Sequence, residues 1–272
     1  MSSNRTSFTP ARGPVSRRAV ALLYGLLCHS LFAASVVAAV VNLYGGMRWG
    51  IGPWRGWAAV LANALLLVQF PVLHSFLLSK PGRRWLRRLA PAGMGDDLST
   101  TTFALVASVQ MALVFVLWSP SGRIWWEPRG LALGGMIALY AAAWLYLIKA
   151  LTDAGLALQT GALGWTSVWR GRRPQFGSFP THGLFKSCRQ PVYLGFALTL
   201  WTGPVWTPDR LVLAVLWTAY CVVGPLFKER RCTVWYGDAF RSYQERVPYL
   251  IPRLRQRPVR ETGEAETLPK AS

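Results

Sequence analysis

The sequence predicts an all-α protein: a polytopic integral membrane bundle of about six spans, ending in a C-terminal helical hairpin with a cytoplasmic cap. Three observations predict this class. The 272-residue chain is 52% hydrophobic and only 15% charged, whereas a soluble domain carries about a quarter charged residues. Its apolar residues are gathered into long runs. Its basic residues alternate between sparse and dense from one connection to the next, as the topology of a membrane protein requires.

The apolar runs define the expected spans. The first four are long enough to cross the bilayer, since about 20 residues of helix are needed for roughly 30 Å of hydrocarbon. The fifth is short, so we expect neighbouring helices to shield it or the segment to cross incompletely. The sixth pairs with the fifth as a tight hairpin. The runs lie at residues 19–44, 57–78, 100–118, 131–151, 192–206 and 209–227.

The distribution of lysine and arginine predicts the orientation of the bundle. From the first 18 residues to the tail after residue 227, the connections carry 4, 2, 5, 2, 5, 1 and 10 of them, with Arg210 at the start of the sixth run counted in the tight fifth connection. Because positive charge gathers on the cytoplasmic side, both termini are expected to be cytoplasmic, at the inner membrane if the source is bacterial. This topology accounts for the net charge of +19, and no motif for binding nucleic acid accompanies it.

On this prediction the chain divides into four segments. Residues 1–18 and 256–272 are polar tails that we expect to be disordered. Residues 19–151 form a four-span scaffold. Residues 152–255 hold a cytoplasmic loop, the hairpin and its cap. The first apolar run exceeds the roughly 7–15 apolar residues of a secretory signal, so it is expected to remain as a span.

Signatures of common soluble cofactor sites and metal sites are missing from the sequence. There is no G-x-G-x-x-G after a strand, no P-loop and no H-E-x-x-H. The three histidines are not paired at helical ligand spacing, and none of the four cysteines forms a C-x-x-C pair. Neither a metal site nor a disulfide framework is therefore expected. We interpret Cys188 as a small residue in a tight turn.

The most informative segment begins with an R-Q-P sequence that ends at Pro191. Proline lacks a backbone N–H and favours the first position of a helix, so Pro191 is expected to start the fifth span. The free N–H groups of that first turn, with Lys186 and Arg189 nearby, would suit a carboxylate or a phosphate. Tyr193 offers a hydroxyl, and Gly195 permits close approach of a ligand or of another helix.

Glu229 follows the sixth span and is expected to be the one acid at the cytoplasmic end of any span, on the same side as Arg189. An exposed pair of these two residues would contribute little to stability. However, a tryptophan-rich loop and a proline-flanked segment at 248–252 lie close in the sequence. This arrangement favours a covered pocket of mixed charge beside the bilayer.

From residue 183 to residue 252 the chain follows the pattern R-[HQ]-P-x-Y-x-G, a hairpin, a glutamate, and then [FY]-G-x-x-[FY]-x-x-Y ending in a proline. This pattern resembles the isoprenylcysteine carboxyl methyltransferase family, polytopic membrane enzymes that use S-adenosylmethionine. The layout of the whole chain resembles bacterial members, of the methanethiol S-methyltransferase-like and NnrU-like kinds. The resemblance implies that residues 152–255 form a catalytic region. It would transfer a methyl group to a small-molecule or lipid-like acceptor, with a thiol or a carboxylate as the accepting group.

By the same resemblance, residues from both ends of the hairpin would form the site. Three residues are assigned to catalysis: Glu229, Arg189 and Arg230. The residues assigned to the cofactor pocket are Lys186, Gln190, Pro191, Tyr193, Leu194, Gly195, Tyr236, Gly237 and Tyr243.

One position departs from the family's pattern, since Gln190 stands where the family usually has histidine. Glutamine can donate and accept hydrogen bonds, but it cannot titrate near neutral pH. Two alternatives stay open. A membrane reductase of the sterol-reductase type carries a similar hairpin motif and would bind NADPH, and a non-catalytic paralogue could keep the hairpin as a scaffold.

Overall fold

The computed structural model describes residues 14–252, which form nine α-helices, one 3-10 helix and no strand. The predicted all-α class is confirmed. The helix α1 begins at Pro14, inside the segment predicted as a tail, and the predicted tail 256–272 lies outside the described residues. The elements are α1 (Pro14–Tyr44), α2 (Gly56–Leu77), α3 (Lys80–Leu89), α4 (Gly95–Val116), α5 (Gly130–Asp153), α6 (Leu156–Gln159), α7 (Ala162–Trp169), η1 (Gly183–Lys186), α8 (Pro191–Thr202) and α9 (Pro208–Arg246).

Five helices of the described region are long and apolar enough to cross a membrane, namely α1, α2, α4, α5 and α9. The sixth apolar helix, α8, has only 12 residues, in agreement with the short fifth run of the sequence. The helix α9 continues well beyond its predicted span, to Arg246. Its charged sequence after Phe227 contains no proline or glycine before Gly237, so nothing breaks the helix where it leaves the apolar run.

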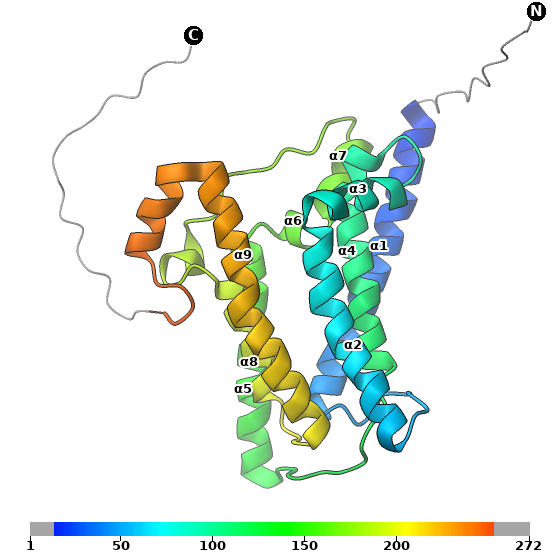
Figure 1. The fold of residues 1–272 in the computed structure, drawn as a ribbon, viewed down its shortest axis with the longest axis vertical. Helices are drawn as coiled ribbons and strands as arrows, with labels where there is room; N and C mark the ends of the chain where they lie inside the picture. Colours follow the sequence, from blue (N-terminus) through cyan, green and yellow to red (C-terminus); the bar gives the residue numbers. More distant parts are fainter. Residues whose placement is uncertain (1–13, 253–272) are drawn as a thin grey trace, which may run out of the picture.

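The helices form two groups that converge at one end of the molecule (Figure 1). One group contains α5, α8 and α9, and the other contains α1, α2 and α4, with α3 and α7 at its far end. The turn between α8 and α9 lies at the convergent end. The start of α1 and the last part of α9 both lie toward the divergent end.

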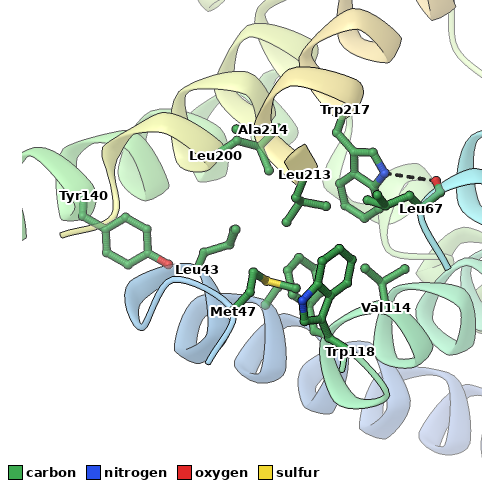
Figure 2. Packing of buried hydrophobic residues seen from close by; sticks show 12 residues of the cluster. Leu43, Met47, Leu67, Val114, Trp118, Tyr140, Leu200, Leu213, Ala214 and Trp217 are labelled. Carbon is green, nitrogen blue, oxygen red and sulfur yellow. Dashed lines mark hydrogen bonds between the residues drawn. The ribbon is translucent and has the colours of Figure 1, made fainter. Parts of the chain in front are cut away.

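The main hydrophobic core joins both groups of helices (Figure 2). Trp118 and Leu213 are at most 1% exposed, and Trp217 packs beside them with its indole N–H donating to the carbonyl of Leu67 at 3.3 Å. Large aromatic side chains contribute most of the buried apolar area in such a cluster. The core includes residues of α1, α2, α4, α5, α8 and α9, so it fixes the hairpin against the scaffold.

Both helices of the hairpin begin at a proline. Pro191 occupies the first turn of α8, as predicted, and Pro208 does the same in α9. The Thr207 hydroxyl caps α9 by accepting from the Arg210 backbone N–H at 3.1 Å, and it also donates to the Gly46 carbonyl at 2.6 Å. This cap binds the tight turn of the hairpin to the end of α1.

Arg210 is fully buried in the turn between α8 and α9. Its guanidinium donates to the carbonyls of Leu200 (3.0 and 2.9 Å), Val205 (2.9 Å) and Gly203, and it lies 4.4 Å from the ring centroid of Trp206. A cation at this depth is tolerated only when backbone carbonyls or other partners satisfy it. Arg210 therefore holds the turn together from inside.

Replacing Arg210 with methionine should destabilise the protein more than any surface substitution. The change leaves three buried carbonyls without their donor, and each unsatisfied group costs about 1–3 kcal/mol. Thermal unfolding in detergent should show a clear fall in melting temperature. The matched substitution Arg123→Met, at an exposed residue of the described region, should leave it unchanged; equal effects of the two substitutions would contradict this role.

Candidate active site

Glu229 lies at the centre of a buried hydrogen-bond network and is itself 6% exposed. Its Oε1 accepts from Arg189 Nε (2.9 Å) and from Gln190 Nε2 (2.7 Å). Its Oε2 accepts from Arg189 Nη2 (3.1 Å) and from Gln244 Nε2 (2.8 Å). Two bonds on each oxygen occupy the four lone-pair directions of a carboxylate. In this arrangement Glu229 has no acceptor capacity left for a ligand.

Arg189 ties the start of α8 to residues far away in the chain. Besides its bidentate pair with Glu229, its Nη1 donates to the carbonyls of Gln244 (2.8 Å) and Val247 (2.6 Å). Its backbone N–H donates to the carbonyl of Pro248 at 2.9 Å. Removing one partner of such a buried ion pair costs about 3–5 kcal/mol, because the other charge is left uncompensated. The pair therefore holds the start of α8 against the last part of α9 and the segment that follows it.

Gln190 connects the central carboxylate to a neighbouring lysine. The side chain is 2% exposed; its amide N–H donates to Glu229, and its amide oxygen accepts from Lys228 Nζ at 3.3 Å. A neutral imidazole also offers one donor and one acceptor. Glutamine can therefore make the hydrogen bonds open to the histidine usual in the isoprenylcysteine carboxyl methyltransferase family, without a proton that titrates near neutral pH.

Lys228 is the cation of the site that keeps free hydrogen-bonding capacity. Its ammonium lies 6.0 Å from the ring centroid of Phe185 and 5.9 Å from that of Tyr193, so both rings stabilise the charge. Among the described residues it uses one of its three donors, toward Gln190. The first turn of α8 begins beside Lys228 and has no side-chain cap. The free backbone N–H groups of this turn and the Lys228 ammonium could therefore bind the same anion.

The helix α9 reverses direction at Gly237, whose φ and ψ are 54° and −129°. Glycine adopts this conformation readily, whereas other residues are strained in it. Residues 238–252 then form a C-terminal arm that folds back toward the start of α8 (orange in Figure 1). Without the reversal, neither Gln244 nor Val247 could reach Arg189.

An aromatic cluster holds the C-terminal arm in place. The Phe179 ring lies 4.9 Å from Tyr236, 5.2 Å from Phe240 and 5.5 Å from Tyr243, measured between ring centroids. The Tyr243 hydroxyl donates to the carbonyl of Phe185 at 2.7 Å. The two tyrosines predicted to close the cofactor pocket, Tyr236 and Tyr243, thus pack the arm against the loop before α8.

Asp153, at the end of α5, supports the same loop. Its carboxylate accepts from the Leu184 backbone N–H at 2.8 Å and pairs with Lys149 one turn earlier. Gly183, with φ of 56°, lies where any Cβ would collide with this carboxylate. The expectation that Glu229 is the one acid at this end of the spans is wrong, because α5 runs two residues past its predicted end.

The structure separates several of the predicted site residues from the central network. Gly195 packs against α5, where a Cβ would lie 3.0 Å from the Cα of Leu147, so it serves helix packing. Lys186 is exposed. Arg230 is exposed too; its guanidinium lies 5.6 Å from the Phe227 ring centroid and, within residues 14–252, forms no ion pair. The remaining predicted residues fall into three places: Arg189, Gln190, Tyr193 and Glu229 in or beside the network, Tyr236, Gly237 and Tyr243 at the base of the arm, and Pro191 and Leu194 in α8.

Three residues of the site were not singled out from the sequence: Lys228, Gln244 and Tyr249. Lys228 could have been found, since it directly precedes Glu229 in the K-E-R-R run. Gln244 gives no local signal, because its contact depends on the reversal of α9. The Tyr249 hydroxyl donates to the Val222 carbonyl at 2.6 Å, and burial raises the pKa of this phenol to about 12.

The four cysteines are all buried and reduced. Burial raises the pKa of the Cys188 thiol, which keeps it in the unreactive protonated form at neutral pH. This environment supports the interpretation of Cys188 as a packing residue.

The fold and the site define a polytopic α-helical membrane protein with a covered polar site at one end of a helical hairpin. Comparison with known proteins then gives its family. The chain is 32% identical to methanethiol S-methyltransferase of a Pseudomonas species, over 89% of this chain and 93% of that protein. The chain belongs to the methanethiol S-methyltransferase family, within the isoprenylcysteine carboxyl methyltransferase-like group that the sequence pattern indicated.

Two further relatives show the breadth of the similarity. Methanethiol S-methyltransferase of Mycobacterium tuberculosis is 32% identical over 71% of this chain and 78% of its own length. Nurim of Rattus norvegicus is 25% identical over 65% of this chain and 74% of its own length. No family model and no solved structure matches the chain.

The bridging role of Gln190 can be tested by two substitutions. Gln190→His keeps one donor and one acceptor and should leave the melting temperature close to that of the unsubstituted protein. Gln190→Leu removes a bond to a carboxylate and an acceptor for a lysine, and bonds to charged groups contribute about 1.5–3 kcal/mol each. Equal melting temperatures for the two variants would contradict the bridge.

The reversal at Gly237 can be tested by limited proteolysis. Gly237→Ala should release the arm, because a non-glycine residue in a sparsely populated backbone region costs about 1–3 kcal/mol. Trypsin should then cleave faster after Arg241 and Arg246. The control is Gly177→Ala, at a glycine without positive φ and with open space around it; equal cleavage of both variants would refute the requirement for glycine.

Proposed function

We propose that this protein is an S-adenosylmethionine-dependent methyltransferase that methylates a small thiol at the network around Glu229. The relatives that it matches along most of its length are named for methyl transfer to methanethiol, and that name supports a thiol as the acceptor. The observation that carries the proposal is Lys228, a cation held between aromatic rings with donors to spare, beside an uncapped helix start.

The residues present fit such a methyl donor. Its carboxylate would suit the Lys228 ammonium and the free N–H groups of the first turn of α8. Its adenine would suit the faces of the aromatic residues that line this end, of which Phe185 and Tyr193 already flank the lysine. When bound, the group would supply a methyl carbon on a positively charged sulfur.

In this proposal Glu229 and Arg189 are positioning residues. The carboxylate is occupied by Arg189, Gln190 and Gln244, so its role is to hold the start of α8 and the arm in register. The arm would cover the site and exclude water, and methyl transfer depends mainly on aligning two reactants and keeping solvent out. Lys186 and Arg230 are exposed and would take no part in this site.

The acceptor chemistry agrees with a site that lacks a histidine. A thiol is nucleophilic as its thiolate, and the thiolate needs no base at the moment of transfer. The positive charge of Lys228 would favour the ionised thiol, whose proton would pass to solvent. The thiolate sulfur would then accept the methyl group as the bond from the methyl carbon to the donor sulfur breaks, and the donor would leave as a neutral thioether. Gln190 is compatible with every part of this reaction.

We further propose that the site faces the cytoplasm, where a soluble methyl donor is available. The alternation of basic residues between the spans supports this orientation of the divergent end. In this division of the chain, residues 19–151 serve as scaffold and residues 152–255 carry the chemistry.

Calorimetric titration of S-adenosylmethionine into the purified protein in detergent tests the proposal, with dimethyl sulfide formation from methanethiol as the second readout. Lys228→Met should weaken donor binding about tenfold to a hundredfold, the loss expected from removing a bond between charged groups worth about 1.5–3 kcal/mol. Arg241→Met, at an exposed arginine of the arm, is the matched control and should bind normally.

Two results would overturn the proposal. Absence of saturable binding by the unsubstituted protein would remove the methyl donor, and NADPH titrated in parallel would then distinguish a reductase from a scaffold. Unchanged binding and turnover in Lys228→Met would show that the protein binds the methyl donor but that Lys228 does not contact it.

A further inference from the structure

A second polar feature lies away from the hairpin, at the divergent end of the scaffold group. A shallow cleft there has two adjoining lobes of about 520 and 420 Å³ that share Asp97 and Arg173. The ends of α1, α3, α4 and α7 form its walls. We name it the arginine cleft, for the five arginines that line it: Arg17, Arg18, Arg87, Arg172 and Arg173.

Positive charge exceeds negative charge in the arginine cleft. Two of its arginines are neutralised, since Arg17 pairs with Asp97 at 3.0 Å and Arg87 with Asp96 at 2.8 Å. The other three form no ion pair with any residue in the range 14–252. Three unpaired guanidiniums on one concave surface repel each other and attract a multiply coordinated anion, for which phosphate has the matching geometry.

The frame of the cleft is firmly packed. Ala21, Leu98 and Val168 form a buried cluster beneath it, joining α1, α4 and α7. Gly171, with φ of 71°, lies so close to Arg18 that a Cβ would stand 2.9 Å from its guanidinium nitrogen. The arginines are therefore presented by a rigid base, although their ends are exposed.

Exposed apolar side chains lie near the cleft on the helices that form its walls. On α1, Leu23 and Leu26 are 67% and 54% exposed within two to three turns of the cleft. The short helix α3 exposes Trp85 (57%) between its arginines and Leu89 (56%) directly after them, a pattern typical of helices that lie in the interface. A soluble anion would make no use of these side chains, whereas a phospholipid would cover them with its acyl chains.

We propose that the arginine cleft binds the phosphate of an anionic phospholipid, with the acyl chains lying along α1 and α3. Basic pockets at the cytoplasmic ends of membrane helices are suited to such headgroups. The inference is independent of methyl transfer, because the cleft and the hairpin site share no residue. It assigns to the scaffold a lipid site that would anchor α3 and α7 at the membrane surface.

Binding of fluorescent phosphatidylglycerol to the full-length protein in uncharged detergent micelles tests the inference. Arg18→Gln combined with Arg173→Gln should weaken binding roughly 30-fold, since each arginine near an anionic lipid surface contributes a factor of roughly five. The control combines Arg123→Gln with Arg129→Gln, two exposed arginines in the connection between α4 and α5, and should bind as the unsubstituted protein does. Fluorescent phosphatidylcholine should bind weakly to all three proteins.

Three outcomes would overturn the inference. Equal affinity for phosphatidylglycerol and phosphatidylcholine would show that the protein does not recognise the charge of the headgroup. Equal losses of lipid affinity in the cleft variant and the control variant would show that the affinity depends on the net charge of the protein and not on the cleft. Full displacement of the lipid by millimolar glycerol phosphate would show that a soluble anion, and no lipid, occupies the cleft.

Discussion

The ion pair between Arg189 and Glu229 is the interaction on which the polar end of this protein depends. Both side chains are largely buried, at 12% and 8% exposed, and a buried charge is stable only when its partners are complete. The carboxylate recruits Gln190 and Gln244, and the guanidinium recruits the carbonyls of Gln244 and Val247. Satisfying this one pair therefore fixes the start of α8 and the arm together.

The two ends of the bundle are stabilised in different ways. At the convergent end, Trp118, Trp217 and their neighbours form one apolar core, and Arg210 closes the hairpin turn through backbone carbonyls. At the divergent end the two helix groups spread, and each keeps its own smaller cluster, around Leu98 and around Phe240. A hydrogen-bond network around Glu229 joins the start of α8 to the arm there. This division separates the main apolar core from the polar network around Glu229.

Much of the fold could be predicted from the sequence, because hydrophobic length and charge distribution act locally. The long apolar runs predicted the five long helices, and Pro191 predicted the start of α8. The arrangement of the site could be predicted only in part. The Y-G pair was recognised as a motif, but the reversal of α9 at Gly237 depends on a backbone conformation that the sequence does not display.

The sequence also does not show which of two neighbouring basic residues faces the site. Lys228 and Arg230 flank Glu229 in sequence, and a helix separates two such positions by about 200° around its axis. Only the packing of α8 against α9 determines which of them faces the site. Lys228 does so, beside Gln190, whereas Arg230 lies over Phe227 on the exposed side.

A double-mutant cycle on Arg189→Met and Glu229→Gln tests the central claim most directly, with S-adenosylmethionine affinity and melting temperature both measured. If the glutamate acts by holding Arg189 and the arm, the double variant should be no worse than the poorer single variant, since residues that share one interaction are strongly non-additive. Losses in affinity that add would contradict the account, because they would show that Glu229 contacts the methyl donor independently of Arg189.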